Sequence, residues 1–69
     1  MSRTNNTRTI LLRLKTRIGR EKGRARKLAE TYRLKGDGVG LERAVGEATV
    51  LGQAQRFIDD ELKRLGERE

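Results

Sequence analysis

The 69-residue chain contains no cysteine, no histidine and no proline. Without cysteine there is no disulfide, and without cysteine and histidine the usual zinc sites and the commonest general base are missing. One tyrosine, one phenylalanine and no tryptophan leave few residues that favour β-strands. We therefore expect a helical protein that is not an enzyme, has no catalytic, cofactor-binding or metal site, and takes no small-molecule substrate.

Long apolar runs are also missing, since the longest is residues 10–12. Such a run is too short for a signal peptide or a membrane span, so we expect a soluble, cytoplasmic chain with no membrane partner. The length allows one domain at most. A chain this short, without disulfides or metals, needs very regular packing, self-association or both.

Charge is abundant and unevenly distributed. Residues 1–35 carry twelve Arg or Lys residues against two Glu, which gives +10, whereas residues 36–69 carry five against eight acids, which gives −3. The two halves attract each other, and the net charge of +7 remains as an excess. That excess favours DNA, RNA or an acidic protein as a partner.

The basic residues are densest at 13–27, where eight of fifteen residues are Arg or Lys and only Glu21 opposes them. Apolar residues recur through this segment at helical spacing, which predicts a helix over about 7–35. Its contact seam is predicted from two rows with seven-residue spacing: Leu11, Ile18, Ala25 and Tyr32, and Leu14, Glu21, Leu28 and Lys35. Gly19 and Gly23 fall on the outward side of this helix.

Three glycines at residues 36–40 mark a turn, in which Gly36 is suited to end one helix and Asp37 to cap the next. A second helix is predicted over about 39–65. Its seam residues follow a 3-4-3-4 spacing: Leu41, Ala44, Ala48, Leu51, Gln55, Ile58, Leu62 and Leu65. Residues 1–6 read as a flexible basic arm, and residues 7–69 as one helical-hairpin domain.

Folding the chain at the turn gives an all-α, antiparallel two-helix hairpin of coiled-coil type. The alignment places Lys15 beside Asp59 and Arg17 beside Glu61, and it puts Glu21 opposite Gln55 in a polar layer. These ion pairs support the hairpin weakly because they are exposed. Six cations are left with no acid of the same chain: Arg13, Arg20, Lys22, Arg24, Arg26 and Lys27.

Several apolar residues lie outside the seam, and Val50 and Phe57 share one stripe because they are seven residues apart. A single hairpin does not cover them. We therefore expect a homodimer that forms a four-helix bundle, with Val50, Ala54 and Phe57 at the dimer or partner interface.

A second interpretation starts from residues 12–18, where apolar and polar residues alternate as in a strand. A strand at about 9–18 followed by two helices resembles the ribbon-helix-helix DNA-binding family, in which a dimeric ribbon enters the major groove. The second helix of this chain is longer than that resemblance implies. In architecture, the all-helical dimer resembles the small RNA-binding hairpin dimers that control plasmid copy number, without a shared motif.

The basic face supplies the functional hypothesis. The predicted nucleic-acid-binding residues, which would contact the phosphate backbone, are Arg13, Arg20, Lys22, Arg24, Arg26 and Lys27. Aromatic residues are missing there, so stacking on bases is not expected. The alternative is a protein-interaction module that docks on or inhibits a larger acidic partner, without nucleic acid. Either function suits a small accessory protein of the kind that phages and plasmids encode.

Overall fold

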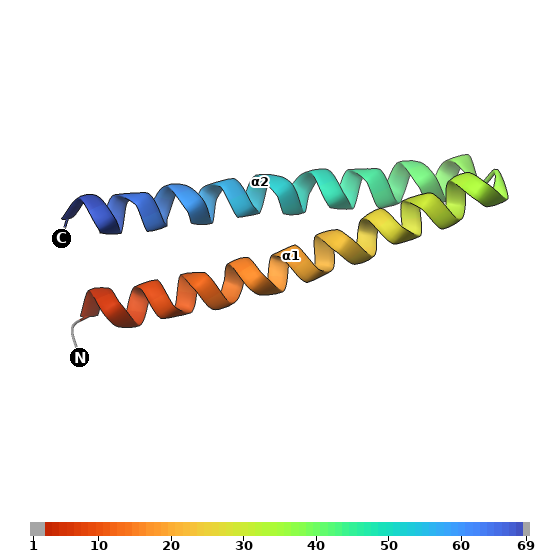
Figure 1. The fold of residues 1–69 in the computed structure, drawn as a ribbon. Helices are drawn as coiled ribbons and strands as arrows, with labels where there is room; N and C mark the ends of the chain where they lie inside the picture. The colour runs from red at the N-terminus through yellow and green to blue at the C-terminus, as the bar shows by residue number, and fades with distance from the viewer. Residues whose placement is uncertain (1–2, 69) are drawn as a thin grey trace.

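A computed structural model describes residues 3–68 of the chain, with the side chains of residues 6–67. Two helices, α1 (Arg3–Lys35) and α2 (Gly38–Arg68), run antiparallel and form a hairpin (Figure 1). The turn lies at one end of the hairpin, and the start of α1 and the end of α2 lie together at the other (Figure 1). The Cα atoms extend over 51 × 16 × 11 Å, which makes the molecule a layer two helices wide and one helix deep.

The prediction of an all-helical hairpin is confirmed for residues 3–68, which contain no strand. The alternative with a strand at residues 9–18 is wrong, because these residues lie within α1. Arg, Leu and Lys are good helix formers, and Leu11 and Ile18 contribute to a helical seam that a strand would break. Neither helix in this part of the chain combines the length and the apolar character that spanning a bilayer requires.

The helix boundaries extend beyond those predicted. Helix α1 begins at Arg3 rather than at residue 7, and α2 begins at Gly38 and continues to Arg68 rather than ending at residue 65. Of the predicted arm at residues 1–6, residues 1 and 2 lie outside the described residues, and residues 3–6 belong to α1. No proline or glycine in these residues interrupts the helix.

The turn has the predicted capping chemistry. Gly36 adopts a φ of 74°, which glycine tolerates without a steric penalty. The amide of Gly36 donates to Arg33 O at 3.2 Å and that of Asp37 to Tyr32 O at 2.9 Å, the two bonds of a Schellman motif. Asp37 Oδ1 then accepts a hydrogen bond from the amide of Gly40 at 3.0 Å. Asp37 therefore takes part in the C-terminal cap of α1 and is also the N-cap of α2.

The predicted seam of α2 is confirmed, since all eight of its residues are buried or half-buried. Among the described side chains, however, only three apolar ones are buried, and two of these are alanines: Ala25, Ala44 and Ile58, which are 2%, 3% and 8% exposed. The helices approach closely at the turn because Gly40 has no side chain. A Cβ at this position would lie 2.5–2.7 Å from three ring atoms of Tyr32. The core is therefore a thin line along the hairpin.

Half of the predicted seam of α1 is wrong. Leu11, Ile18, Ala25 and Tyr32 do face α2, but the second row is exposed, with Leu14 at 42% and Leu28 at 47%. The residues that turn towards α2 instead are Lys15, Lys22 and Ala29, as their contacts and burial show. This rotation of α1 leaves Glu21 and Lys35 in water. Lysine tolerates the seam because its methylene stem packs while its ammonium group reaches a polar partner.

The polar pairs between the helices follow from that rotation. Lys15 Nζ lies 2.6 Å from Asp59 Oδ1, which confirms the predicted pair. The predicted Glu21–Gln55 layer is wrong, because Gln55 Oε1 accepts instead from Lys22 Nζ at 3.3 Å. Gly19 is half-buried rather than outward, since a Cβ there would lie 3.2 Å from Gln55 Nε2.

Two other predicted partners changed as well. Glu21 Oε1 pairs with Arg24 of the same helix at 3.2 Å, so the prediction that Arg24 lacks an acid is wrong. Glu61 pairs with Arg64 at 3.1 Å rather than with Arg17. In both cases a partner three residues away on the same helix needs no ordering of a second helix, and it therefore forms at lower entropic cost.

Candidate nucleic-acid interface

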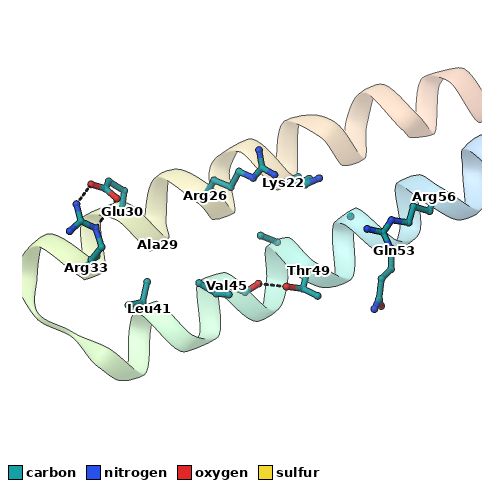
Figure 2. Close-up of a pocket in the computed structure, with 12 residues that line it drawn as sticks. Lys22, Arg26, Ala29, Glu30, Arg33, Leu41, Val45, Thr49, Gln53 and Arg56 are labelled. Atoms are coloured by element: carbon teal, nitrogen blue, oxygen red, sulfur yellow. Dashed lines mark hydrogen bonds and ion pairs between the residues drawn. The ribbon is translucent and has the colours of Figure 1, made fainter.

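One long side of the hairpin carries a hollow of about 480 Å³ between α1 and α2. Figure 2 shows that both helices contribute side chains to it. We call it the basic groove, and its lining residues are Lys22, Arg26, Ala29, Glu30, Arg33, Leu41, Val45, Ala48, Thr49, Gly52, Gln53 and Arg56. The groove exists because the residues at its floor are small, notably Ala29, Ala48 and Gly52.

The charge of the basic groove is one-sided. Four of its lining residues are cations, Lys22, Arg26, Arg33 and Arg56, and Glu30 is its single acid. Three of these cations come from α1 and one from α2, so the positive charge faces the hollow from both walls (Figure 2). Such a concentration of one sign of charge in a concave surface raises the local concentration of anions.

Lys22 occupies the deepest position among these cations, since it is half-buried while the three arginines are exposed. Its ammonium group donates to Gln55 Oε1 at 3.3 Å, and it lies 3.4 Å from the position that a Cβ on Gly52 would take. A neutral amide holds the lysine without cancelling its charge. Lys22 therefore supplies a fixed positive charge near the floor of the basic groove.

Glu30 neutralises only the end of the groove that is nearest the turn. Its Oε2 accepts from Arg33 Nε at 3.0 Å, and a second guanidinium nitrogen donates to its other oxygen. This hydrogen bonding lowers the pKa of Glu30 below its ordinary value and raises the pKa of Arg33. The carboxylate is thus ionised at neutral pH and engaged with one cation.

Arg26 and Arg56 face the same hollow from opposite helices, and neither has a hydrogen bond or an ion pair within the described part of the chain (Figure 2). Both side chains are exposed. A free guanidinium group has five N–H donors in a planar fork, which matches two oxygens of a phosphate or carboxylate. These two arginines are therefore the best-placed anion ligands of the groove.

The structure distributes the six cations that the sequence selected over three surfaces. Lys22 and Arg26 line the basic groove. Arg13 and Arg20, with Arg17, line a separate hollow of about 460 Å³ on α1. Arg24 lines a hollow on the opposite side of the hairpin and is paired with Glu21, while Lys27 is exposed and lines none of these hollows.

Two groove cations were not selected from the sequence. Arg33 lies seven residues after Arg26 and thus on the same stripe of α1, a spacing that could have identified it. Arg56 lies in the acidic half of the chain, and it joins the groove only because α2 folds back beside α1. Arg56 can be assigned to the basic groove only when the orientation of each helix about its own axis is known.

The opposite long side of the hairpin is apolar. We call it the apolar face and define it by Leu14, Leu28, Val50 and Ala54; Val50 is 63% exposed and Ala54 is half-buried. Phe57, which is 73% exposed, lines a hollow on the outer side of α2 together with Gln53, Arg56 and Asp60. A hollow of about 610 Å³ lies on this face, lined by Glu21, Arg24, Ala25, Leu28, Gly46, Glu47, Val50 and Leu51. Of the three residues predicted for an interface, Val50 and Ala54 thus lie on the same side as two leucines that were assigned to the seam, whereas Phe57 lies apart from them.

Comparison of the chain with known protein families, with curated protein sequences and with solved structures finds no match.

Proposed function

We propose that this protein is a non-enzymatic accessory protein that binds the phosphate backbone of nucleic acid through its basic groove. The observation that carries the proposal is the cluster of four cations around a floor of small residues, with one carboxylate that is already engaged. Cations gathered around one hollow raise the local concentration of anions, and Gln55 already holds Lys22 in place before a ligand arrives. A nucleic-acid ligand also agrees with a cytoplasmic location, which we propose with it.

The length of the basic surface favours a chain of phosphates over a single small anion. Lys22 and Arg33 are separated by about 16 Å along α1, at roughly 1.5 Å per residue. Arg13, Arg20 and Lys27 form an outward row that extends the positive charge over about 21 Å of the same helix. The lack of aromatic residues in the groove supports binding to the backbone of a duplex rather than stacking on single-stranded bases.

We further propose that two hairpins associate through their apolar faces into a four-helix bundle. The support is the thin core, in which three apolar side chains of the described residues are buried, together with the exposure of Leu14, Leu28 and Val50. A chain of this size gains stability by burying such a surface against a second copy.

The test of the proposed function is a salt titration of binding to a short duplex, with DNA and RNA duplexes measured separately. Four phosphate contacts predict a loss of affinity of about 100-fold between 50 and 200 mM salt. Arg26→Glu with Arg56→Glu should weaken binding at low salt at least tenfold and reduce the salt slope by about two. No binding of the unaltered protein at about 50 mM salt would refute the proposal.

The matched control is Arg43→Glu with Lys63→Glu, which changes the net charge by the same amount and alters no residue of the basic groove. We expect this control to weaken binding by less than about threefold through the general loss of positive charge. Equal losses in the two double variants would show that net charge, rather than the groove, determines binding.

The second candidate function is a protein-interaction module that receives an acidic segment of a larger protein. It is favoured by the exposure of Phe57, because a large exposed aromatic residue is typical of interface anchors. Polyglutamate serves as the probe. Binding to polyglutamate without binding to either duplex at the same salt concentration supports this function instead.

A further inference from the structure

The basic groove and the apolar face lie on opposite sides of the same thin layer. One hollow is lined by Lys22, Arg26 and Arg56, and the other by Arg24, Leu28 and Val50. The layer is one helix deep, with a smallest Cα extent of 11 Å. Anything that covers the apolar face therefore leaves the basic groove open to solvent.

The two halves of the apolar face differ in charge. On α1, Arg17 and Arg24 lie between Leu14 and Leu28 along the helix. On α2, Val50 and Ala54 are flanked by Glu47 and Glu61. Arg24, Leu28, Glu47 and Val50 line one hollow, so they lie at one level along the hairpin. The Lys15–Asp59 pair fixes the level nearer the chain ends, where Leu14, Arg17, Phe57 and Glu61 lie.

Two-fold symmetry allows two ways to stack a pair of apolar faces. With the axis parallel to the helices, α1 lies on α2 of the second copy, so that Leu28 meets the partner's Val50. Arg24 then lies near the partner's Glu47, and Arg17 near the partner's Glu61. With the axis across the helices, α1 lies on α1, and Arg17 approaches the partner's Arg24.

Four other charges at this face do not alter the preference, and of these Lys35 lies at the end of α1, nearer the turn than the proposed pairs. Glu21 pairs with Arg24 and Arg64 pairs with Glu61 within the chain, and each of these exposed pairs contributes little. Arg43 lies nearer the turn, beyond Glu47 along α2. Both arrangements place apolar residues on apolar residues, but the one with α1 on α2 also brings opposite charges together. This charge complementarity identifies a second copy as the occupant.

We propose that two copies pack through their apolar faces with both turns at the same end, and that this dimer bridges two nucleic-acid duplexes. This inference rests on the proposed function of the basic groove. In the dimer, each groove faces outward on its own side of a bundle about two helix layers thick, or roughly 20 Å. One dimer then presents two binding sites that point in opposite directions, and each takes a separate duplex.

The bridging test uses a biotin-labelled duplex on beads, a second duplex that is fluorescent, and the full chain at about 50 mM salt. We expect the unaltered protein to retain the fluorescent duplex on the beads. Leu28→Asp with Val50→Asp should reduce this retention at least tenfold, while binding to a single duplex in solution changes less than about threefold. Circular dichroism establishes whether this variant is folded.

The outcomes separate this inference from the proposed function. If the unaltered protein binds a single duplex but does not retain the second one, bridging is refuted and groove binding stands. If it binds no duplex at all, the proposed function itself fails. If the Leu28→Asp, Val50→Asp variant is folded and bridges as well as the unaltered protein, the apolar face is not the dimer contact.

The orientation of the dimer is tested by oxidative cross-linking, for which a chain without cysteine gives no background. A Leu28→Cys chain mixed with a Val50→Cys chain should give a mixed cross-linked dimer in high yield. The matched control mixes Leu28→Cys with Leu14→Cys, which would be adjacent in the other arrangement. A higher yield in the control overturns the proposed orientation, and this readout does not depend on nucleic-acid binding.

Discussion

The two long sides of this hairpin are built from the same two helices, yet they carry opposite chemistry. On one side, Lys22, Arg26 and Arg56 surround a floor of alanine and glycine. On the other, Leu14, Leu28 and Val50 are exposed to water. Both properties follow from one choice, the rotation of α1 that turns Lys15, Lys22 and Ala29 towards α2.

The comparison teaches that a hydrophobic pattern does not by itself identify the core of so small a protein. Placing Leu14 and Leu28 in the seam would bring Glu21 and Lys35 with them, because these four residues share one row. Burying an unpaired carboxylate is more costly than leaving two leucines half exposed. The leucines then become available for contact with another molecule, and the lysines gain polar partners.

The largest loss of stability is expected from disrupting the buried core between the two helices, which supports both sides of the hairpin. Ile58 is 8% exposed, so Ile58→Asp would bury an unpaired charge and should lower the free energy of unfolding by about 3–5 kcal/mol. Thermal unfolding followed by circular dichroism measures the change. Val39→Asp is the control, because Val39 is 71% exposed at the start of α2, where an acid is favourable. Similar melting temperatures for the two variants would contradict the assigned core.

A smaller loss is expected at the turn, where the alignment that defines both sides is set. Gly40→Ala would place a Cβ within 2.5–2.7 Å of the Tyr32 ring and should reduce stability by roughly 1–3 kcal/mol through overpacking. Gly38→Ala, with no atom within 4 Å, should be neutral or slightly stabilising. Chemical denaturation compares the two variants. A Gly40→Ala protein as stable as the Gly38→Ala protein would show that Tyr32 does not pack there.

The apolar face is compared with the separate hollow on α1 by removing one leucine from each. Leu28 on the apolar face and Leu12 beside Arg13 are 47% and 49% exposed, so area alone does not distinguish them. We expect Leu28→Ser to weaken self-association about tenfold, or roughly 1.4 kcal/mol, and Leu12→Ser to leave it unchanged. Sedimentation equilibrium measures both. A purely monomeric unaltered protein, or a larger effect of Leu12→Ser, would count against the apolar face as the contact.

The smallest effect is expected from the single acid of the basic groove. Glu30→Gln releases Arg33 from its carboxylate partner and should raise the affinity for a duplex by about three- to tenfold, since one more cation becomes free. Glu47→Gln makes the same charge change on the opposite side of the hairpin and should alter single-duplex affinity less than twofold. Fluorescence anisotropy at fixed salt measures both variants. Equal gains would show that the groove has no special role.

The elements that sequence reasoning predicted well are those controlled by local chemistry. The seam of α2 repeats without a charged residue, so one rotation of that helix buries it all. Gly36 and Asp37 specify the turn because few other residues adopt a φ of 74° or cap a helix with a carboxylate. The Lys15–Asp59 pair followed from aligning the two helices.

The second row of α1 was predicted wrongly because each of its residues was judged alone. Two leucines in a heptad position favour the seam, and the cost of Glu21 and Lys35 in the same row was underestimated. Lys15 was placed beside Asp59 and Lys22 beside the seam without an acid, and neither was counted as a seam residue, although their methylene stems pack well. The composition of the basic groove could not be derived without this rotation.

By itself, the sequence determined an antiparallel pair of helices, the position of the turn, the inward residues of α2 and an excess of positive charge. These depend on propensities, caps and spacing within one segment. Only the tertiary structure decided which cations share a surface, because this depends on how far each helix is rotated about its axis. The rotation is set by the sum of many small contacts between the helices, and it joins Arg56 to Lys22, Arg26 and Arg33 while separating them from Arg24.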